Sequence, residues 1–199
     1  MTPPLILASS SATRRAMLEN AGVIPELRPA RIDEEAIRLA LVSDGANPRD
    51  IADHLAEQKT RRIAAKEPAR MVLGSDQVLA FEGEVLGKAP DAETLRAQLA
   101  RLNGKTHHLY SAAVIYDAGE PVWRHVGHVR MHMRRSSDSY LDDYVARNWD
   151  EVRHCVGGYQ IEHEGLRLFS RIEGDYFSVL GLPLTELLGY LTLRGVIDG

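Results

Sequence analysis

The segment Leu5–Leu18, LILASSSATRRAML, passes from an apolar strand into a helix. The apolar start predicts a short buried strand over Leu5–Ala8, and the spacing from Thr13 to Asn20 predicts a helix that ends at Gly22. Free backbone N–H groups and the positive end of a helix dipole meet at such a junction, where Ser and Arg side chains add donors for anionic oxygens. The segment fits a phosphate site, although taken alone it favours the simpler interpretation of a helix that Ser11 caps.

Helical patterns recur along the chain, in regions where apolar residues are three or four positions apart. Asp91 and Gly104 are suited to begin and end one of these helices, and Pro183 precedes the final one. The predicted helices cover Pro48 to about Ala65, 90–104, 136–148 and Leu184–Leu193.

Strand patterns lie between these helices. The stretch 71–88, MVLGSDQVLAFEGEVLGK, predicts a strand, a polar interruption, a second strand, a turn at Glu82–Gly83 and a third strand. A long hairpin is predicted to turn near residues 118–120, and residues 176–184 are predicted to be strand or loop. Alternating helices and strands indicate a layered α/β fold, and the hairpins favour a mixed sheet flanked by helices over an all-parallel one.

Composition limits the functional classes. The 199 residues are enough for a single domain, 1–199, and the net charge of −4 gives no indication of a nucleic-acid or membrane-surface partner. Cys155 is the only cysteine, so no intramolecular disulfide can form. The N-terminus lacks a basic region, and no apolar run approaches the roughly 18 residues of a membrane helix. These features predict a cytoplasmic protein.

Three patterns that suggest chemistry have simpler explanations. His128 and His132 would lie about 13 Å apart on a strand, too far for one metal ion, so a solvated strand face is favoured. The stretch 83–88, GEVLGK, is one residue short of a Walker A loop and has Ala89 in place of Ser or Thr. His154 and Cys155 are sequence neighbours that point apart on an extended chain, which favours a buried structural thiol over a nucleophile.

Two carboxylates are stronger candidates. Asp76 follows a run that is predicted to be a buried strand, where an ionised carboxylate needs a partner or a cation. Glu34 lies in the acidic stretch IDEE and is a second, weaker candidate of the same kind.

Together these segments resemble the Maf family of nucleoside triphosphate pyrophosphatases over nearly the whole chain. LILASSSATRRAML resembles the family's opening L-A-S-x-S-P-x-R-R, IDEE its acidic V-D-E, and LAEQKT its A-x-x-K-A segment. LGSDQVLAFEGEVLGKAPD resembles its central aspartate strand followed by G-K-P, and LARLNGKTHHLYSAAVI its L-x-x-L-S-G-x-x-H-x-V-x-T. CVGGYQIEHEG and IEGDYFSVLGLPL resemble its late motifs.

The resemblance implies an inosine triphosphatase-like (Maf/Ham1) fold, with an active-site cleft between two lobes and hydrolysis of a nucleoside triphosphate to a monophosphate and pyrophosphate. It implies that Asp76 accepts a proton and that Asp76 and Glu34 bind Mg²⁺ or Mn²⁺. It also implies a set of phosphate or nucleotide contacts, which are Ser9, Ser11, Arg14, Arg15, Lys59 and Lys88.

Three positions bear on the choice of base. The uridine/thymidine triphosphate branch of the family has Arg, Thr and Gln at the positions of Thr13, Gln77 and Glu162, and the 7-methyl-GTP branch has Trp, Gln and Glu. This chain therefore carries two of the three markers of the second branch, and a carboxylate suits the paired N–H donors of a guanine edge. Ala12 and Val156 also depart from the family pattern, where proline and alanine are usual.

Other functions stay open at this level. A uridine- or thymidine-preferring pyrophosphatase is one alternative, a nucleotide-binding regulator of cell division with little catalysis is another, and a general phosphatase is a third. The family resemblance also suggests a homodimer.

Overall fold

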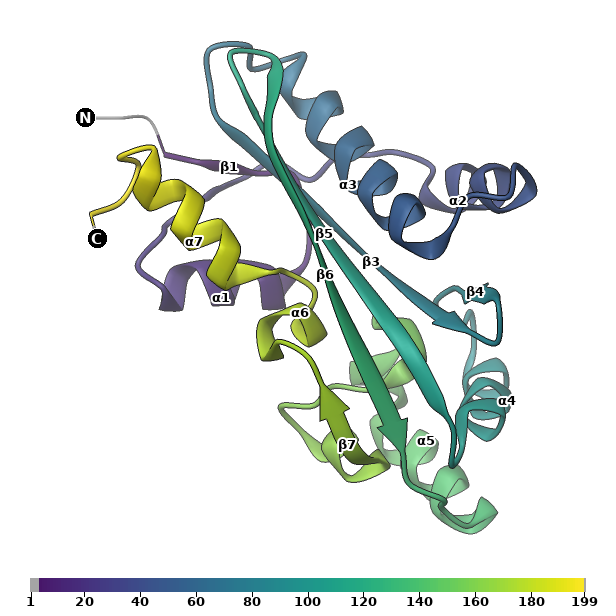
Figure 1. Ribbon diagram of the computed structural model, residues 1–199. Helices are drawn as coiled ribbons and strands as arrows, with labels where there is room; N and C mark the ends of the chain where they lie inside the picture. Colours follow the sequence, from purple (N-terminus) through teal and green to yellow (C-terminus); the bar gives the residue numbers. More distant parts are fainter. Residues whose placement is uncertain (1–3, 199) are drawn as a thin grey trace.

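One mixed sheet runs through the part of the chain that the computed structural model describes, residues 4–198 (Figure 1). Its order is β2-β1-β3-β5-β6-β7, and β4 pairs with β3 outside this path. β1 is parallel to β2 and β3, and the other pairs are antiparallel. The strands are β1 (Ile6–Leu7), β2 (Glu26–Leu27), β3 (Val72–Phe81), β4 (Glu84–Leu86), β5 (Thr106–Asp117), β6 (Glu120–Met133) and β7 (Phe169–Glu173).

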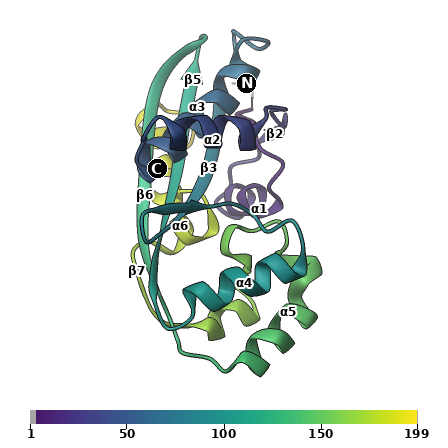
Figure 2. The same cartoon turned by 90° about the vertical axis from the view of Figure 1, so that its right-hand side faces the viewer.

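Helices cover both faces of this sheet and gather at its two ends (Figures 1 and 2). They are α1 (Ala12–Asn20), α2 (Glu34–Ser43), α3 (Pro48–Ala64), α4 (Ala92–Leu102), α5 (Asp138–Val152), α6 (Tyr176–Leu180) and α7 (Leu184–Leu193), with short 3₁₀ turns at Val156–Gly158 and Glu164–Leu168. α1, α3 and α7 surround one lobe and α4 and α5 the other, while β3, β5 and β6 connect the lobes. This arrangement confirms the predicted α/β class and mixed sheet.

Side-chain alternation along the strands divides the core. In β1, Ile6 packs into the cluster beneath α3, whereas the adjacent Leu7 packs into the cluster beneath α1 and α7. A third cluster, which includes Leu95, Leu99 and Leu102 of α4, fills the second lobe. The predicted apolar faces of these helices are therefore confirmed.

Two predictions of local structure are wrong, and one helix was not predicted. The polar residues of 71–88 do not interrupt a strand: β3 is continuous, and Asp76 lies in its middle rather than at its end. The acidic stretch begins a helix, because Asp33 caps α2 by accepting a hydrogen bond from Ala36 N at 3.0 Å. Residues 176–180 form α6, which Asp175 caps and which ends at Gly181, at a positive φ of 102°.

Within residues 4–198, no helix combines the length and the hydropathy that crossing a bilayer requires.

Candidate active site

A cleft of about 780 Å³ opens where β3 lacks a partner along one edge. β1 pairs with β3 only at Val72 and Leu73, and β4 pairs with it only from Leu79 onward. The intervening residues keep their β5 partners but face the cleft on the other side. Because side chains alternate along a strand, Asp76 and Gln77 enter this cleft from opposite faces of the sheet.

The ammonium group of Lys59 joins the two candidate carboxylates on the Asp76 side. Lys59 extends from α3, and its Nζ donates to Asp76 Oδ1 at 2.5 Å and lies 3.0 Å from Glu34 Oε1 at the start of α2. The side chains of Lys59 and Asp76 are 7% and 9% exposed, whereas that of Glu34 is 46% exposed. Three residues that are far apart in the sequence therefore form one charged cluster at the bottom of the cleft.

The first loop brings the N-terminus of α1 to the same cleft. Ser9 Oγ accepts from Ser11 N and from Arg14 Nη1, each at 3.2 Å, and Ser11 Oγ caps the helix by accepting from Arg14 N at 3.3 Å. The N–H groups of the first helical positions, Ala12 and Thr13, have no acceptor within the helix and lie on the cleft wall. The cap and the anion site are therefore compatible.

Arg14 ties this loop to the rest of the cleft. Its Nε donates to Gly181 O at 2.8 Å, and its Nη1 donates to Ser75 O at 3.0 Å on the open edge of β3. Burial lowers the pKa of Arg14 from its usual range, although the charges of Asp76 and Glu34 oppose this shift. Much of the guanidinium's hydrogen-bonding capacity is thus used within the protein.

Arg15, the second predicted phosphate contact on α1, does not line the cleft. Its side chain is exposed, and its Nε pairs with Glu19 Oε1 at 2.7 Å on the outer face of the helix. Consecutive helical residues point in directions about 100° apart, and here Arg14 faces the cleft while Arg15 faces away from it.

All three predicted specificity positions, Thr13, Gln77 and Glu162, line the cleft. Gln77 Nε2 donates to Ser111 Oγ at 2.9 Å and to the carbonyl oxygens of Ser178 and Val179 at 3.1 and 2.9 Å, which fixes the orientation of the amide. Thr13 and Glu162 line the same cleft, and Glu162 is exposed. No hydrogen bond joins Gln77 to Glu162 in residues 4–198.

Lys88 and Cys155 also line the cleft. Lys88 is exposed and follows β4, so GEVLGK forms a turn and a strand rather than a phosphate loop before a helix. Cys155 is half-buried, and burial raises the pKa of its thiol, which fits the predicted structural role better than a nucleophile.

Two residues of the site were missed by sequence reasoning. Tyr159 lines the cleft, and its hydroxyl lies 2.7 Å from Nε2 of the fully buried His107. Burial lowers the pKa of His107 to about 3. Arg38 also lines the cleft, one helical turn after Glu34. The four-residue spacing from Glu34 could have placed Arg38 on the same helical face, but the helix α2 was not predicted.

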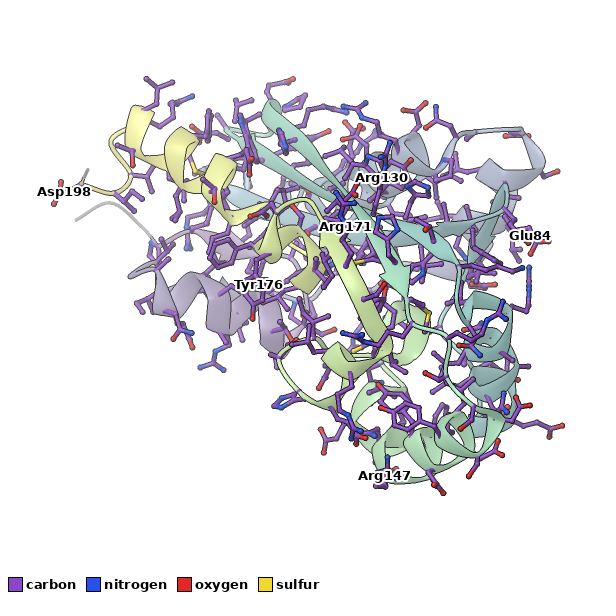
Figure 3. All side chains as sticks on the ribbon, turned by 60° about the horizontal axis from the view of Figure 1, so that its bottom comes forward. Glu84, Arg130, Arg147, Arg171, Tyr176 and Asp198 are labelled. Atoms are coloured by element: carbon purple, nitrogen blue, oxygen red, sulfur yellow. The ribbon has the colours of Figure 1, made fainter. Side chains whose placement is uncertain are left out.

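The predicted solvated strand face is confirmed. Arg130 of β6 and Arg171 of β7 extend from the outer face of the sheet (Figure 3), where His128 stacks on Tyr110 with ring centroids 4.7 Å apart. His128 and Arg130 are exposed and lie outside the cleft.

The charged cluster offers two carboxylates to a metal ion. Across residues 4–198, no three His, Cys, Asp or Glu side chains converge in a way that could hold one. Mg²⁺ is usually bound by one or two carboxylates together with substrate phosphates and water. The donor set of Glu34 and Asp76 fits an ion that is bound jointly with a phosphate chain.

The fold and the cleft define a class: a mixed α/β protein in which a helix N-terminus and a lysine–carboxylate cluster line one cleft. Residues 4–193 match the family model described as Maf-like protein, and the chain belongs to this family.

Curated relatives match this chain over its whole length. A protein of Ruegeria pomeroyi named nucleoside triphosphate pyrophosphatase is 60% identical over 198 residues, with 100% of both chains covered. A protein of Mesorhizobium japonicum named 7-methyl-GTP pyrophosphatase is 45% identical over 199 residues, again with 100% of both covered. Among solved structures, a HAM1 protein from Coxiella burnetii aligns with 68% of this chain and 75% of its own at 16% identity and a TM-score of 0.42, a likeness too weak to add support.

Proposed function

We propose that this chain hydrolyses nucleoside triphosphates to a nucleoside monophosphate and pyrophosphate. The observation that carries the proposal is the placement of the Lys59–Asp76–Glu34 cluster opposite the N-terminus of α1 in one cleft. The names of the full-length relatives support the same activity. We also propose that residues 1–199 act as one domain, because the cleft draws residues from Ala8 to Leu180.

In the proposed reaction, a water molecule attacks the α-phosphorus of the bound nucleotide. Asp76 orients this water and accepts its proton as the new P–O bond forms. The bond between the α-phosphorus and the bridging oxygen breaks, and pyrophosphate leaves with the electron pair. Lys59, the N–H groups at the start of α1 and the side chains of Ser9, Ser11, Arg14 and Lys88 hold the phosphate oxygens and neutralise their charge.

Glu34 and Asp76 are the proposed ligands for a divalent ion, Mg²⁺ or Mn²⁺. When bound, such an ion supplies charge neutralisation to the phosphate oxygens. Lys59 now occupies one oxygen of each carboxylate, so the other oxygens, Glu34 Oε2 and Asp76 Oδ2, are the donors left for the ion.

The preferred base is proposed to be guanine or a 7-methylated guanine. The Gln77 amide nitrogen is already engaged by three acceptors, so its oxygen and the carboxylate of Glu162 both present acceptors to the cleft. Two acceptors suit the N1–H and N2–H donors of guanine and oppose the carbonyls of uracil or thymine. Thr13 provides no ring to stack on the base, which departs from the tryptophan of the 7-methyl-GTP branch.

The test is a panel of nucleoside triphosphates, including 7-methyl-GTP, GTP, UTP and dTTP, assayed with Mn²⁺ for pyrophosphate and orthophosphate. We expect pyrophosphate, released fastest from a guanine nucleotide. Orthophosphate alone would indicate a phosphatase, and no release from any nucleotide would indicate a nucleotide-binding regulator. The proposed setting is the cytoplasm, with a homodimer as the assembly and no nucleic-acid or membrane partner.

A further inference from the structure

Arg38 is a cation in the cleft to which the reaction above gives no role. Its side chain is only 16% exposed, and it lines the cleft from α2. Residues four apart on a helix lie on the same face with Cβ atoms about 5–6 Å apart, so Arg38 is beside Glu34 and one turn farther along the cleft. This places Arg38 on the Asp76 side of β3, opposite to the side that Gln77 faces.

Contacts with the β4 segment fix the guanidinium across the cleft. Nη1 donates to Val85 O at 3.3 Å. Gly87, two residues after Val85, has no side chain, and a Cβ atom at this position would lie 3.2 Å from Arg38 Nη2. The guanidinium therefore lies against the strand that leads directly to Lys88.

The remaining edge of the guanidinium is occupied by an acidic side chain of α2 itself. Nε donates to Glu35 Oε2 at 3.1 Å, and Nη2 donates to Glu35 Oε1. This pair of parallel donors matches two phosphate oxygens as well as it matches a carboxylate. The Glu35 side chain is 63% exposed, and such pairs contribute little to stability, so a phosphate of higher charge can displace it.

The limited packing of α2 against the rest of the protein permits a phosphate to replace the Glu35 carboxylate. None of the residues Glu34–Ser43 is fully buried. Only Ile37 and Leu41 pack, half-buried, against the core beneath α3, and polar contacts through Glu34 and Arg38 link the helix to the cleft. Small movements of α2 therefore disturb no fully buried side chain of the helix.

We propose that Arg38 is a further substrate-binding residue, which holds the β- and γ-phosphates of the nucleotide in the place that the Glu35 carboxylate takes in the free protein. This inference rests on the proposed function, because the α-phosphorus is placed at the Asp76 cluster and Arg38 lies one turn beyond it. The leaving pyrophosphate is then held by a two-donor contact that the nucleoside monophosphate lacks.

The test is calorimetric titration of the full-length protein with inorganic pyrophosphate and, separately, with GMP, both in the presence of Mg²⁺. We expect Arg38→Ala to weaken pyrophosphate binding at least tenfold and to leave GMP binding within about twofold. Arg38→Lys keeps the charge but loses the two-donor edge and should be intermediate. Glu35→Gln removes the competing carboxylate and should tighten pyrophosphate binding several-fold.

Matched controls come from an ion pair outside the cleft. Arg101 Nη2 lies 2.7 Å from Glu84 Oε2, and Glu84 extends from the edge of the molecule (Figure 3). Arg101→Ala and Glu84→Gln should change neither titration. Unchanged pyrophosphate binding in Arg38→Ala, equal weakening of GMP, or no pyrophosphate binding by the unaltered protein would overturn the inference. The titrations measure binding and need no hydrolysis, so they test Arg38 separately from the proposed function. If Arg38 contributes to pyrophosphate binding but no nucleotide releases pyrophosphate, the proposed function is refuted and the role of Arg38 is not.

Discussion

Replacement of Lys59 by methionine is expected to destabilise the protein more than the loss of any surface ion pair. Methionine keeps much of the length of the side chain but removes the ammonium group that lies 2.5 Å from Asp76 Oδ1. Breaking a buried pair by removing one partner costs about 3–5 kcal/mol, because the other charge is left buried and uncompensated. The half-exposed Glu34 admits water to the cluster, so we expect a loss of about 2–4 kcal/mol, which corresponds to about 5–15 °C in Tm.

The assay is chemical denaturation of the metal-free protein, with Lys59→Met, Asp76→Asn and the double variant compared in one cycle. Removing both charges should recover part of the loss, with a coupling of about 1–3 kcal/mol between the two positions. Lys105→Met is the control, because Lys105 Nζ pairs with Glu82 Oε1 at 3.0 Å on the surface; it should cost less than about 1 kcal/mol. A Lys59→Met loss no larger than this control, or single losses that simply add, would refute the reasoning.

Three further predictions concern the surroundings of the cluster. Arg14→Ala should lower the free energy of unfolding by about 1–3 kcal/mol, because Gly181 O and Ser75 O lose a charged donor. Calorimetry with a non-hydrolysable triphosphate should also show weaker binding by this variant, most strongly at low salt. Unchanged stability would contradict the tethering role of Arg14. Glu162→Gln should shift the ratio of kcat/KM for GTP over UTP by about five- to 150-fold toward UTP, and a constant ratio would show that Glu162 does not contact the base. The pKa of His107 is lowered to about 3 in the folded protein, so below about pH 6.5 the unfolded chain binds a proton at this residue that the folded protein does not bind. The contribution of His107 to the free energy of unfolding is therefore complete above pH 6.5 and falls by about 1.4 kcal/mol per pH unit toward pH 3. The stability difference between the unaltered protein and His107→Gln should shrink accordingly from pH 7 to pH 5, and a constant difference would argue against a neutral buried imidazole.

Elements with local signals were predictable from the sequence. Asp91 caps α4 through a hydrogen bond from Thr94 N at 2.7 Å, and the leucines of that helix are buried as their spacing predicts. The hairpin turn at Ala118–Gly119 has the two positive φ values, 50° and 81°, that tight hairpins require. These features depend on neighbours in the sequence, which is why patterns reveal them.

The errors lie where distant contacts decide the structure. Ser75, Asp76 and Gln77 look like a break in a strand, yet β5 pairs with all three while their polar side chains find partners on α3 and α6. α2 was missed because its apolar residues form no single buried stripe: Ile37 and Leu41 pack half-buried against the core beneath α3, whereas Leu39 and Val42 are exposed. α6 has only five residues, too few for a periodic pattern.

Most of the residues predicted for the site line one cleft, but the contacts among them were not predicted. The family resemblance selected Glu34, Lys59 and Asp76, but spacing in the sequence does not indicate that one ammonium group joins both carboxylates. The same limit explains Arg15, which matches the motif but lies on the wrong face of its helix, and Arg38, which matches no motif yet lines the cleft.

The central claim is that Asp76 directs water to the α-phosphorus, and hydrolysis in ¹⁸O-labelled water tests it most directly. Mass spectrometry of the products should find the label in the nucleoside monophosphate and not in pyrophosphate. The Asp76→Asn variant should stay folded, give the same products and turn over about 10²- to 10⁴-fold more slowly, as expected for the loss of a general base. Label in the pyrophosphate, or turnover of Asp76→Asn within about threefold of the unaltered protein, would contradict the account.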